Sequence, residues 1–186
     1  RLCIKALESF RASANSASGE QKAHYEAQIL SLLNNLAQLR AAQKRPEEAI
    51  PLLREVLASR RKTLGNRHND TILVINNLTQ LLICQSNLDE AEELCREGMI
   101  NSREVNGDEH ELTVSLVLAY CDVMQKLHKS PETTPILREM VDKVCTASAE
   151  HSETALAYQK ALAISLADAS EWSEAEFILR RVRSGW

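Results

Sequence analysis

An internal repeat of 42 residues limits the folds open to this chain more than any other feature. The segment "LNNLAQL", from Leu33 to Leu39, is matched 42 positions later by "INNLTQL", from Ile75 to Leu81. Further steps of 42 place "DEAEEL", which begins at Asp89, on "PETTPIL" and then on "SEAEFIL". One such segment cannot bury its apolar surface alone, so the pattern predicts a stack of similar units.

Each repeat has the pattern of two helices joined by a short turn. In the second copy Ile72, Ile75 and Leu78 recur at helical spacing, and a new run follows the polar turn with Leu88 and Ala91. With only 5 Gly, 4 Pro and 4% aromatic residues, many short strands joined by tight turns are disfavoured. The sequence therefore predicts an all-α fold with helices near 2–15, 22–43, 46–63, 69–85, 88–105, 110–128, 132–147, 151–169 and 172–184.

The repeat frame predicts a single repeat domain over residues 1–186. Its parts are a partial preceding helix and loop at 1–22, then repeats at 23–64, 65–106, 107–148 and 149–186. The loop of the partial repeat is expected at "SANSASG", residues 13–19. Because the chain begins at Arg1 rather than Met, we expect it to be a fragment of a longer protein.

Small residues and chain breakers recur in register with the repeat. Ala49, Ala91 and Ala175 share one position, where a small side chain lets helices approach closely, and Thr133 is the exception that predicts a looser third repeat. The repeated glycines 65 and 107 are expected to end helices in the left-handed conformation. The next helix then starts near Asn69 or Asp70 in one repeat and near Asp108 or Glu109 in the next, and the sequence does not decide which residue is the cap.

Composition argues against several kinds of partner. The net charge of −4 disfavours a nucleic-acid or anionic-membrane surface, and the basic cluster at 60–62 ends a predicted helix, where the helix dipole favours cations. The five cysteines are odd in number and lack a C-x-x-C pair, as expected of buried thiols in a reducing compartment. With no apolar run long enough to span a membrane, the sequence predicts a cytoplasmic protein without membrane insertion.

Nothing in the sequence indicates catalysis. It contains no P-loop, dinucleotide turn, G-x-S-x-G or H-E-x-x-H pattern, and the cysteines lack zinc-ligand spacing. His68, His110 and His151 recur in the same loop of successive repeats, which points to capping and packing, since catalytic groups must converge on one site. We therefore predict no enzyme activity, no catalytic residue, no metal site and no cofactor.

At this level of detail the chain resembles a tetratricopeptide repeat protein. Small Ala37, Ala49, Ala91 and Ala175 set among large apolar positions carry the likeness, and the lag of 42 with "LNNLA…EEAIPLLREVLASRRKTLG" resembles the long variant of kinesin light chains. The resemblance implies a right-handed α-α superhelix, or solenoid, of helix pairs whose first helices line a concave face. It also implies a cargo-adaptor-like role, in which asparagines on that face contact a peptide.

Most of the residues expected on this face lie three or four positions apart on the first helices, and Asn35 and Asn77 lie about 100° further round the helix. The whole set is Ser31, Asn34, Asn35, Gln38, Leu73, Asn76, Asn77, Gln80, Leu118, Asp122, Lys126 and Lys160. Asparagine and glutamine side chains present donors and acceptors that match an extended peptide backbone. The alternative for the asparagines, and chiefly for Asn35 and Asn77, is that they satisfy neighbouring backbone groups and bind nothing.

Two functions follow from these observations. The first is a protein-interaction module, or adaptor, that binds a peptide segment of a partner protein in the groove, with the N-terminal half gripping the peptide backbone. The second is a structural spacer or self-association module, with Trp172, Phe177 and Trp186 as candidate contacts.

Overall fold

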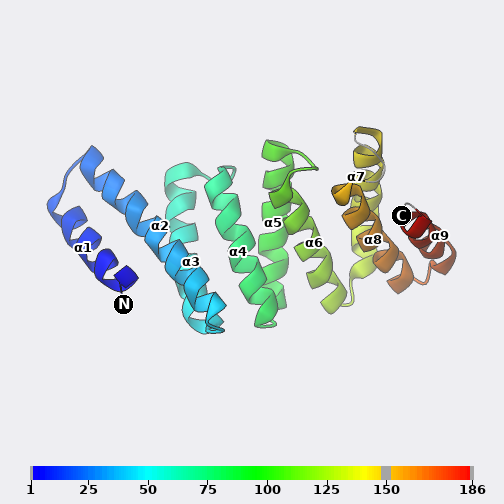
Figure 1. Cartoon of the computed structure of the whole chain (residues 1–186), viewed down its shortest axis with the longest axis horizontal. Coiled ribbons are helices and arrows are strands. Elements are labelled where there is room, and N and C mark those ends of the chain that lie inside the picture. The colour runs from blue at the N-terminus through cyan, green and yellow to red at the C-terminus, as the bar shows by residue number, and fades with distance from the viewer. Residues whose placement is uncertain (1, 148–151, 185–186) are drawn as a thin grey trace. The chain divides into compact units, whose positions relative to one another are not determined.

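The computed structural model describes residues 2–147 and 152–184, and all regular structure within them is helical (Figure 1). The helices pack into two compact units, Arg1–Gln85 and Ser86–Trp186. None of the helices in the described part of the chain is both long and apolar enough to cross a bilayer.

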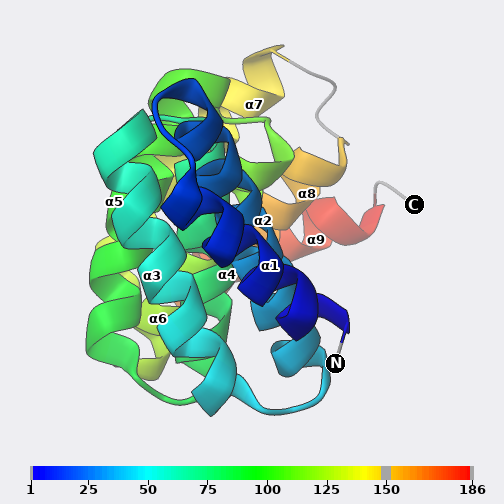
Figure 2. The same cartoon turned by 90° about the vertical axis from the view of Figure 1, so that its left-hand side faces the viewer.

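The N-terminal unit contains four helices: α1 (Leu2–Ser16), α2 (Glu20–Ala42), α3 (Pro46–Leu64) and α4 (Asn69–Cys84). Each helix packs against the next, and Figure 2 shows α1 lying along α2. The core consists of apolar side chains at helical spacing, including Leu33, Leu53, Ile72 and Ile75, which are almost completely buried. Pro46 occupies the first turn of α3, where the missing N–H has no partner to lose.

The C-terminal unit contains α5 (Leu88–Asn106), α6 (Glu111–Lys126), the short 3-10 helix η1 (Ser130–Thr133), α7 (Thr134–Ala147), α8 (Glu153–Asp168) and α9 (Trp172–Ser184). Helix α8 is central, because it packs against α6, α7, α9 and η1. Its buried face, which includes Tyr158, Leu162 and Leu166, fills the core together with Leu116 of α6 and Met140 of α7.

The small-residue positions of the repeat lie where the sequence predicts them. Ala49, Ala91 and Ala175 are buried, and so is Thr133. At Thr133, however, the second helix does not begin as a regular α-helix: η1 precedes α7, which starts at Thr134 rather than near 132. The repeat with the larger polar side chain is thus the one in which the second helix begins with a 3-10 turn.

The turns between paired helices also follow the 42-residue period. Lys44, Ser86, His128 and Ser170 are spaced by 42 and have φ angles of 58°, 56°, 58° and 64°. The left-handed region disfavours L-residues, and none of the four is glycine or asparagine. The backbone therefore repeats in all four copies, although the third and fourth copies have lost much of the sequence match.

Three local predictions need correction. Residues 13–16 are the last turn of α1 and not a loop, so that only residues 17–19 connect α1 to α2. Gly65 and Gly107 do end helices with positive φ, but their ψ angles of 171° and 174° lie in the extended glycine region rather than in the left-handed helical one. The caps of α4 and α6 are His68 and His110, which were not among the four residues considered.

Candidate functional site

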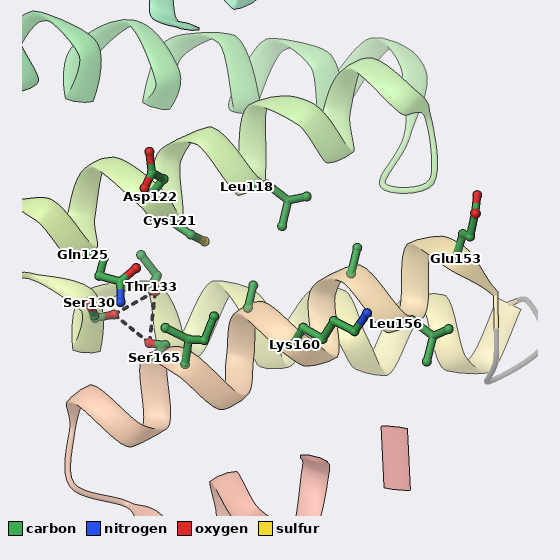
Figure 3. Close-up of a pocket in the computed structure, with 13 residues that line it drawn as sticks. Leu118, Cys121, Asp122, Gln125, Ser130, Thr133, Glu153, Leu156, Lys160 and Ser165 are labelled. Atoms are coloured by element: carbon green, nitrogen blue, oxygen red, sulfur yellow. Dashed lines mark hydrogen bonds between the residues drawn. The ribbon is translucent and has the colours of Figure 1, made fainter. Parts of the chain in front are cut away.

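An open pocket of about 580 Å³ lies between α6 and α8 of the C-terminal unit and reaches down to η1 (Figure 3). Leu118, Leu156 and Ile164 supply much of its apolar wall, together with the small residues Ala157 and Ala161. Ile164 is 49% exposed. Burying such an apolar surface against a partner releases water and lowers the free energy of the complex.

The helical repeat explains how two helices build this wall. Leu118, Asp122 and Gln125 follow one another at spacings of four and three along α6, and so they share one face. The opposite face of α6 carries buried residues such as Leu116 and Val123, which hold the helix in the core. Helix α8 is divided in the same way, with Lys160 on the pocket side and Leu162 in the core.

Three hydroxyl-bearing residues, Ser130, Thr133 and Ser165, form the floor of the pocket, and Thr134 adjoins them. Ser165 Oγ donates to the carbonyl oxygen of Ser130 at 2.7 Å, and Thr133 Oγ1 donates to the same carbonyl at 2.7 Å. The hydroxyls of Thr134 and Ser165 are 2.7 Å apart. All four residues are almost fully buried, and these bonds satisfy the hydroxyls of Thr133, Thr134 and Ser165, which would otherwise cost about 1–3 kcal/mol each.

Charged and sulfur-bearing groups lie around the rim. Asp122 is paired with Lys126 one turn further along α6, while Lys160 and Glu153 are exposed on α8. Cys121 faces the pocket, and burial raises the pKa of its thiol to about 12. The thiol is therefore protonated at neutral pH and acts as a small apolar wall rather than as a nucleophile.

The predicted residues of the N-terminal unit lie on α2 and α4 and differ in exposure. Asn35, Gln38, Leu73 and Gln80 are exposed, whereas Asn76 is partly buried. Ser31 is exposed too, and its hydroxyl donates to the carbonyl of Ala27, one turn earlier, at 3.0 Å.

Two asparagines of this surface carry buried amide atoms. Oδ1 of Asn34 and Nδ2 of Asn77 are buried without a hydrogen-bond partner. An unpaired buried polar atom costs about 1–3 kcal/mol. Because these two atoms have almost no exposed surface, a ligand on the helix face would reach them only if the side chains moved.

Ser31 also belongs to a second hollow, of about 460 Å³, between α2 and the α3–α4 turn. Arg60, His68 and Asp70 line its other side. Arg60 and Asp70 form an ion pair, and so these two charges largely neutralise each other within the N-terminal unit.

The repeated histidines act as helix caps. Nδ1 of His68 accepts from the backbone N–H of Asp70 at 3.1 Å, and Nδ1 of His110 accepts from that of Leu112 at the same distance. Ser152 takes this role for α8, its Oγ accepting from the N–H of Ala155 at 3.1 Å. The predicted capping role is thus confirmed for two histidines, and His151 lies outside the described residues.

The structure brings three predicted residues of the C-terminal unit, Leu118, Asp122 and Lys160, to one pocket. Sequence reasoning missed the rest of the α8 wall, although counting in steps of three and four from Lys160 reaches Glu153, Ala157 and Ile164. It also missed the hydroxyl floor, which depends on contacts between η1 and α8. No group of three or more His, Cys, Asp or Glu able to hold a metal occurs in the described residues.

Comparison with known proteins confirms the resemblance. Residues 28–99 match the family model of the tetratricopeptide repeat, and the helix-pair fold is that of tetratricopeptide-type repeats. No curated protein matches the sequence significantly. Residues 28–99 therefore match tetratricopeptide repeats in sequence, and the described helices have the fold of such repeats.

The solved structures that share this fold include repeats of a kinesin light chain. The nearly identical TPR-like repeats of a Podosopora anserina kinesin light chain superpose with a TM-score of 0.80 at 21% identity, over 97% of this chain and 84% of that one. A glutamine-to-methionine variant of the same repeats gives 0.81 at 20% identity over the same shares. BtubC (BKLC) from P. vanneervenii gives 0.75 at 12% identity, over 98% and 72% of the chains. At these identities the likeness establishes the fold alone.

Proposed function

We propose that this chain is a non-catalytic adaptor module that binds a segment of a partner protein on the exposed faces of its first helices. The observation that carries the proposal is the pocket between α6 and α8, which combines partly exposed apolar side chains such as Leu118, Leu156 and Ile164 with polar and charged groups. Binding sites for protein segments have this composition, with apolar pockets that read side chains and polar groups that fix orientation.

The N-terminal unit supplies a different surface for the same task. Its amide side chains on α2 and α4, among them Asn34, Asn76 and Gln80, offer donors and acceptors to a peptide main chain. A cytoplasmic location agrees with the four free cysteines among the described side chains.

A substitution that fills the pocket tests the proposal. Peptides selected from a display library for binding to the whole chain are measured again with Ala161→Phe, which places a ring in the pocket, and with Ala167→Phe, which lies on α8 outside its lining. We expect the first variant to weaken binding at least tenfold and the second to leave it unchanged, at equal helicity. Equal binding to both variants by every selected peptide would refute a role for this pocket.

The N-terminal surface has its own test. Asn34→Ala combined with Asn76→Ala should lower the affinity for peptides that bind to this surface, because the amides proposed to contact the peptide main chain are lost. The control is Asn15→Ala with Asn101→Ala, which removes two helical asparagines of α1 and α5. If both double variants bind every peptide equally, the amide surface is not a peptide site.

A second function, self-association, is favoured by the exposure of α9. Trp172 is 66% exposed and Phe177 is 59% exposed, and a large exposed apolar surface is typical of an interaction site. Trp186, the third candidate contact, lies outside the described residues. Sedimentation velocity over a concentration series tests this function: it predicts a dimer that Trp172→Ser with Phe177→Ser abolishes, and a monomer at all concentrations would exclude it.

A further inference from the structure

The pocket between α6 and α8 is one part of a longer groove that follows the axis of α8. A neighbouring hollow of about 370 Å³, lined by His128, Pro131 and Asp168, shares Gln125 and Ser130 with it. The joint lining extends from Glu153 to Asp168, the first and last residues of α8. Sixteen helical residues span about 24 Å, so the groove is as long as four helical turns.

We propose that this groove binds an amphipathic α-helix of the partner, laid lengthwise between α6 and α8. The inference rests on the proposed function and adds the conformation and chemistry of the bound segment to it. The partner helix carries apolar residues along one face and basic residues near both ends.

The small supply of hydrogen-bonding groups in the groove favours a helix as the bound segment. An extended peptide exposes an unpaired N–H and C=O on nearly every residue, and each must find a partner when it is buried. The groove has few side chains that could bond a peptide main chain: Gln125, Ser130, His128, Lys160 and three carboxylates. The hydroxyls of Thr133 and Ser165 are already bonded within the floor. A helix satisfies its own backbone internally, and so this groove suits a helix better than a strand.

The shape of the α8 wall also favours a bound helix. Ala157 and Ala161 lie one turn apart on α8 and leave a furrow between Leu118 and Ile164. Small residues on one helix let the ridge of another approach to about 8–10 Å between axes. A partner helix lying in the furrow would cover Ile164, which is 49% exposed.

The charges at the two ends of α8 favour basic residues at the ends of the partner helix. Asp122 is neutralised by Lys126, whereas exposed Glu153 and Asp168 have no ion pair within residues 2–147 and 152–184. These two carboxylates lie at opposite ends of α8. Basic side chains about four turns apart on a partner helix would therefore meet one carboxylate each.

Two libraries displayed on phage test the inference. One presents a 16-residue segment on a rigid helical scaffold with one face randomised, and the other presents linear 16-residue peptides with a proline at every fourth position, which cannot form helices. Both are selected on the whole chain, and clones are kept when Ala161→Phe weakens them at least tenfold while Ala167→Phe does not.

We expect the clones that depend on the pocket to come from the helical library and to carry Lys or Arg near both ends. The double substitution Glu153→Lys with Asp168→Lys should lower the affinity for these clones at least tenfold at low salt. Glu93→Lys with Asp142→Lys, an equal change of charge at exposed positions on α5 and α7, should not.

The outcomes separate the inference from the proposed function. If the pocket-dependent clones come only from the proline-containing library, the groove takes an extended segment, so the inference fails while the proposed function stands. If they are helical but indifferent to the charge of residues 153 and 168, the assignment of basic ends is wrong. If neither library yields a pocket-dependent clone, both the inference and the role of this pocket are refuted.

Discussion

Replacing Lys44 with glycine should stabilise the protein. Lys44 is exposed and has a φ of 58°, the conformation shared by Ser86, His128 and Ser170 at intervals of 42 residues. An L-residue in this conformation costs about 1–2 kcal/mol relative to glycine, and glycine loses about 0.5–1 kcal/mol more backbone entropy on folding. The difference predicts that the free energy of unfolding rises by about 0.5–1 kcal/mol.

Urea denaturation followed by circular dichroism measures this change, with Lys44→Ala as the matched control. Alanine removes the same side chain but keeps the Cβ, and so it should not stabilise. For a chain of this size the gain corresponds to roughly 1–4 °C in Tm. Because the four turns are far apart, glycine at all four should add up to about 2–4 kcal/mol. If Lys44→Gly is no more stable than Lys44→Ala, the repeated left-handed turn is not strained as argued.

Three further predictions concern packing, capping and the pocket thiol. Ala91→Leu should lower the free energy of unfolding by about 1–3 kcal/mol because Ala91 is fully buried, whereas Ala58→Leu, at an exposed site on α3, should change it little; equal effects in urea would contradict the packing role. His110→Ala should lower the free energy of unfolding by about 0.5–2 kcal/mol through loss of the cap on α6, and His110→Asn should lower it less. Thermal melts in which the Asn variant is no more stable than the Ala variant would contradict capping by His110. Burial raises the pKa of Cys121 to about 12, so at pH 8 its labelling by Ellman's reagent should be slower than that of exposed Cys84 and should accelerate as the pH rises; comparable rates for both thiols at pH 8 would disprove the burial.

Most of the fold was predictable because one signal repeats. The helical spacing of residues such as Ile72, Ile75 and Leu78 is local, and alignment of four copies reinforces it, so the helix ends agree with prediction within about three residues. The start of α7 was the difficult case, because Thr133 in the preceding 3-10 turn bonds to Ser165, a residue 32 positions away that local patterns do not reveal.

The site was less predictable, for a physical reason. The face of a helix can be inferred from spacing, and Leu118, Asp122 and Lys160 were placed on the pocket side in this way. A pocket also requires the gap between two helices, and this gap depends on small residues such as Ala161 that make no signal of their own. The recurrence of the histidines predicted a capping role, but the start of α4 was assigned to Asn69 or Asp70 because histidine is not a preferred cap residue.

Methyl NMR tests the central claim, binding between α6 and α8, most directly. The whole chain, with labelled Ile, Leu and Val methyl groups, is titrated with a selected peptide that Ala161→Phe weakens. The account predicts shifts and intermolecular NOEs at Leu118, Leu156 and Ile164, and none at Leu179, which is 49% exposed on α9. NOEs confined to Leu179 and its neighbours, with the pocket methyls unmoved, would contradict it.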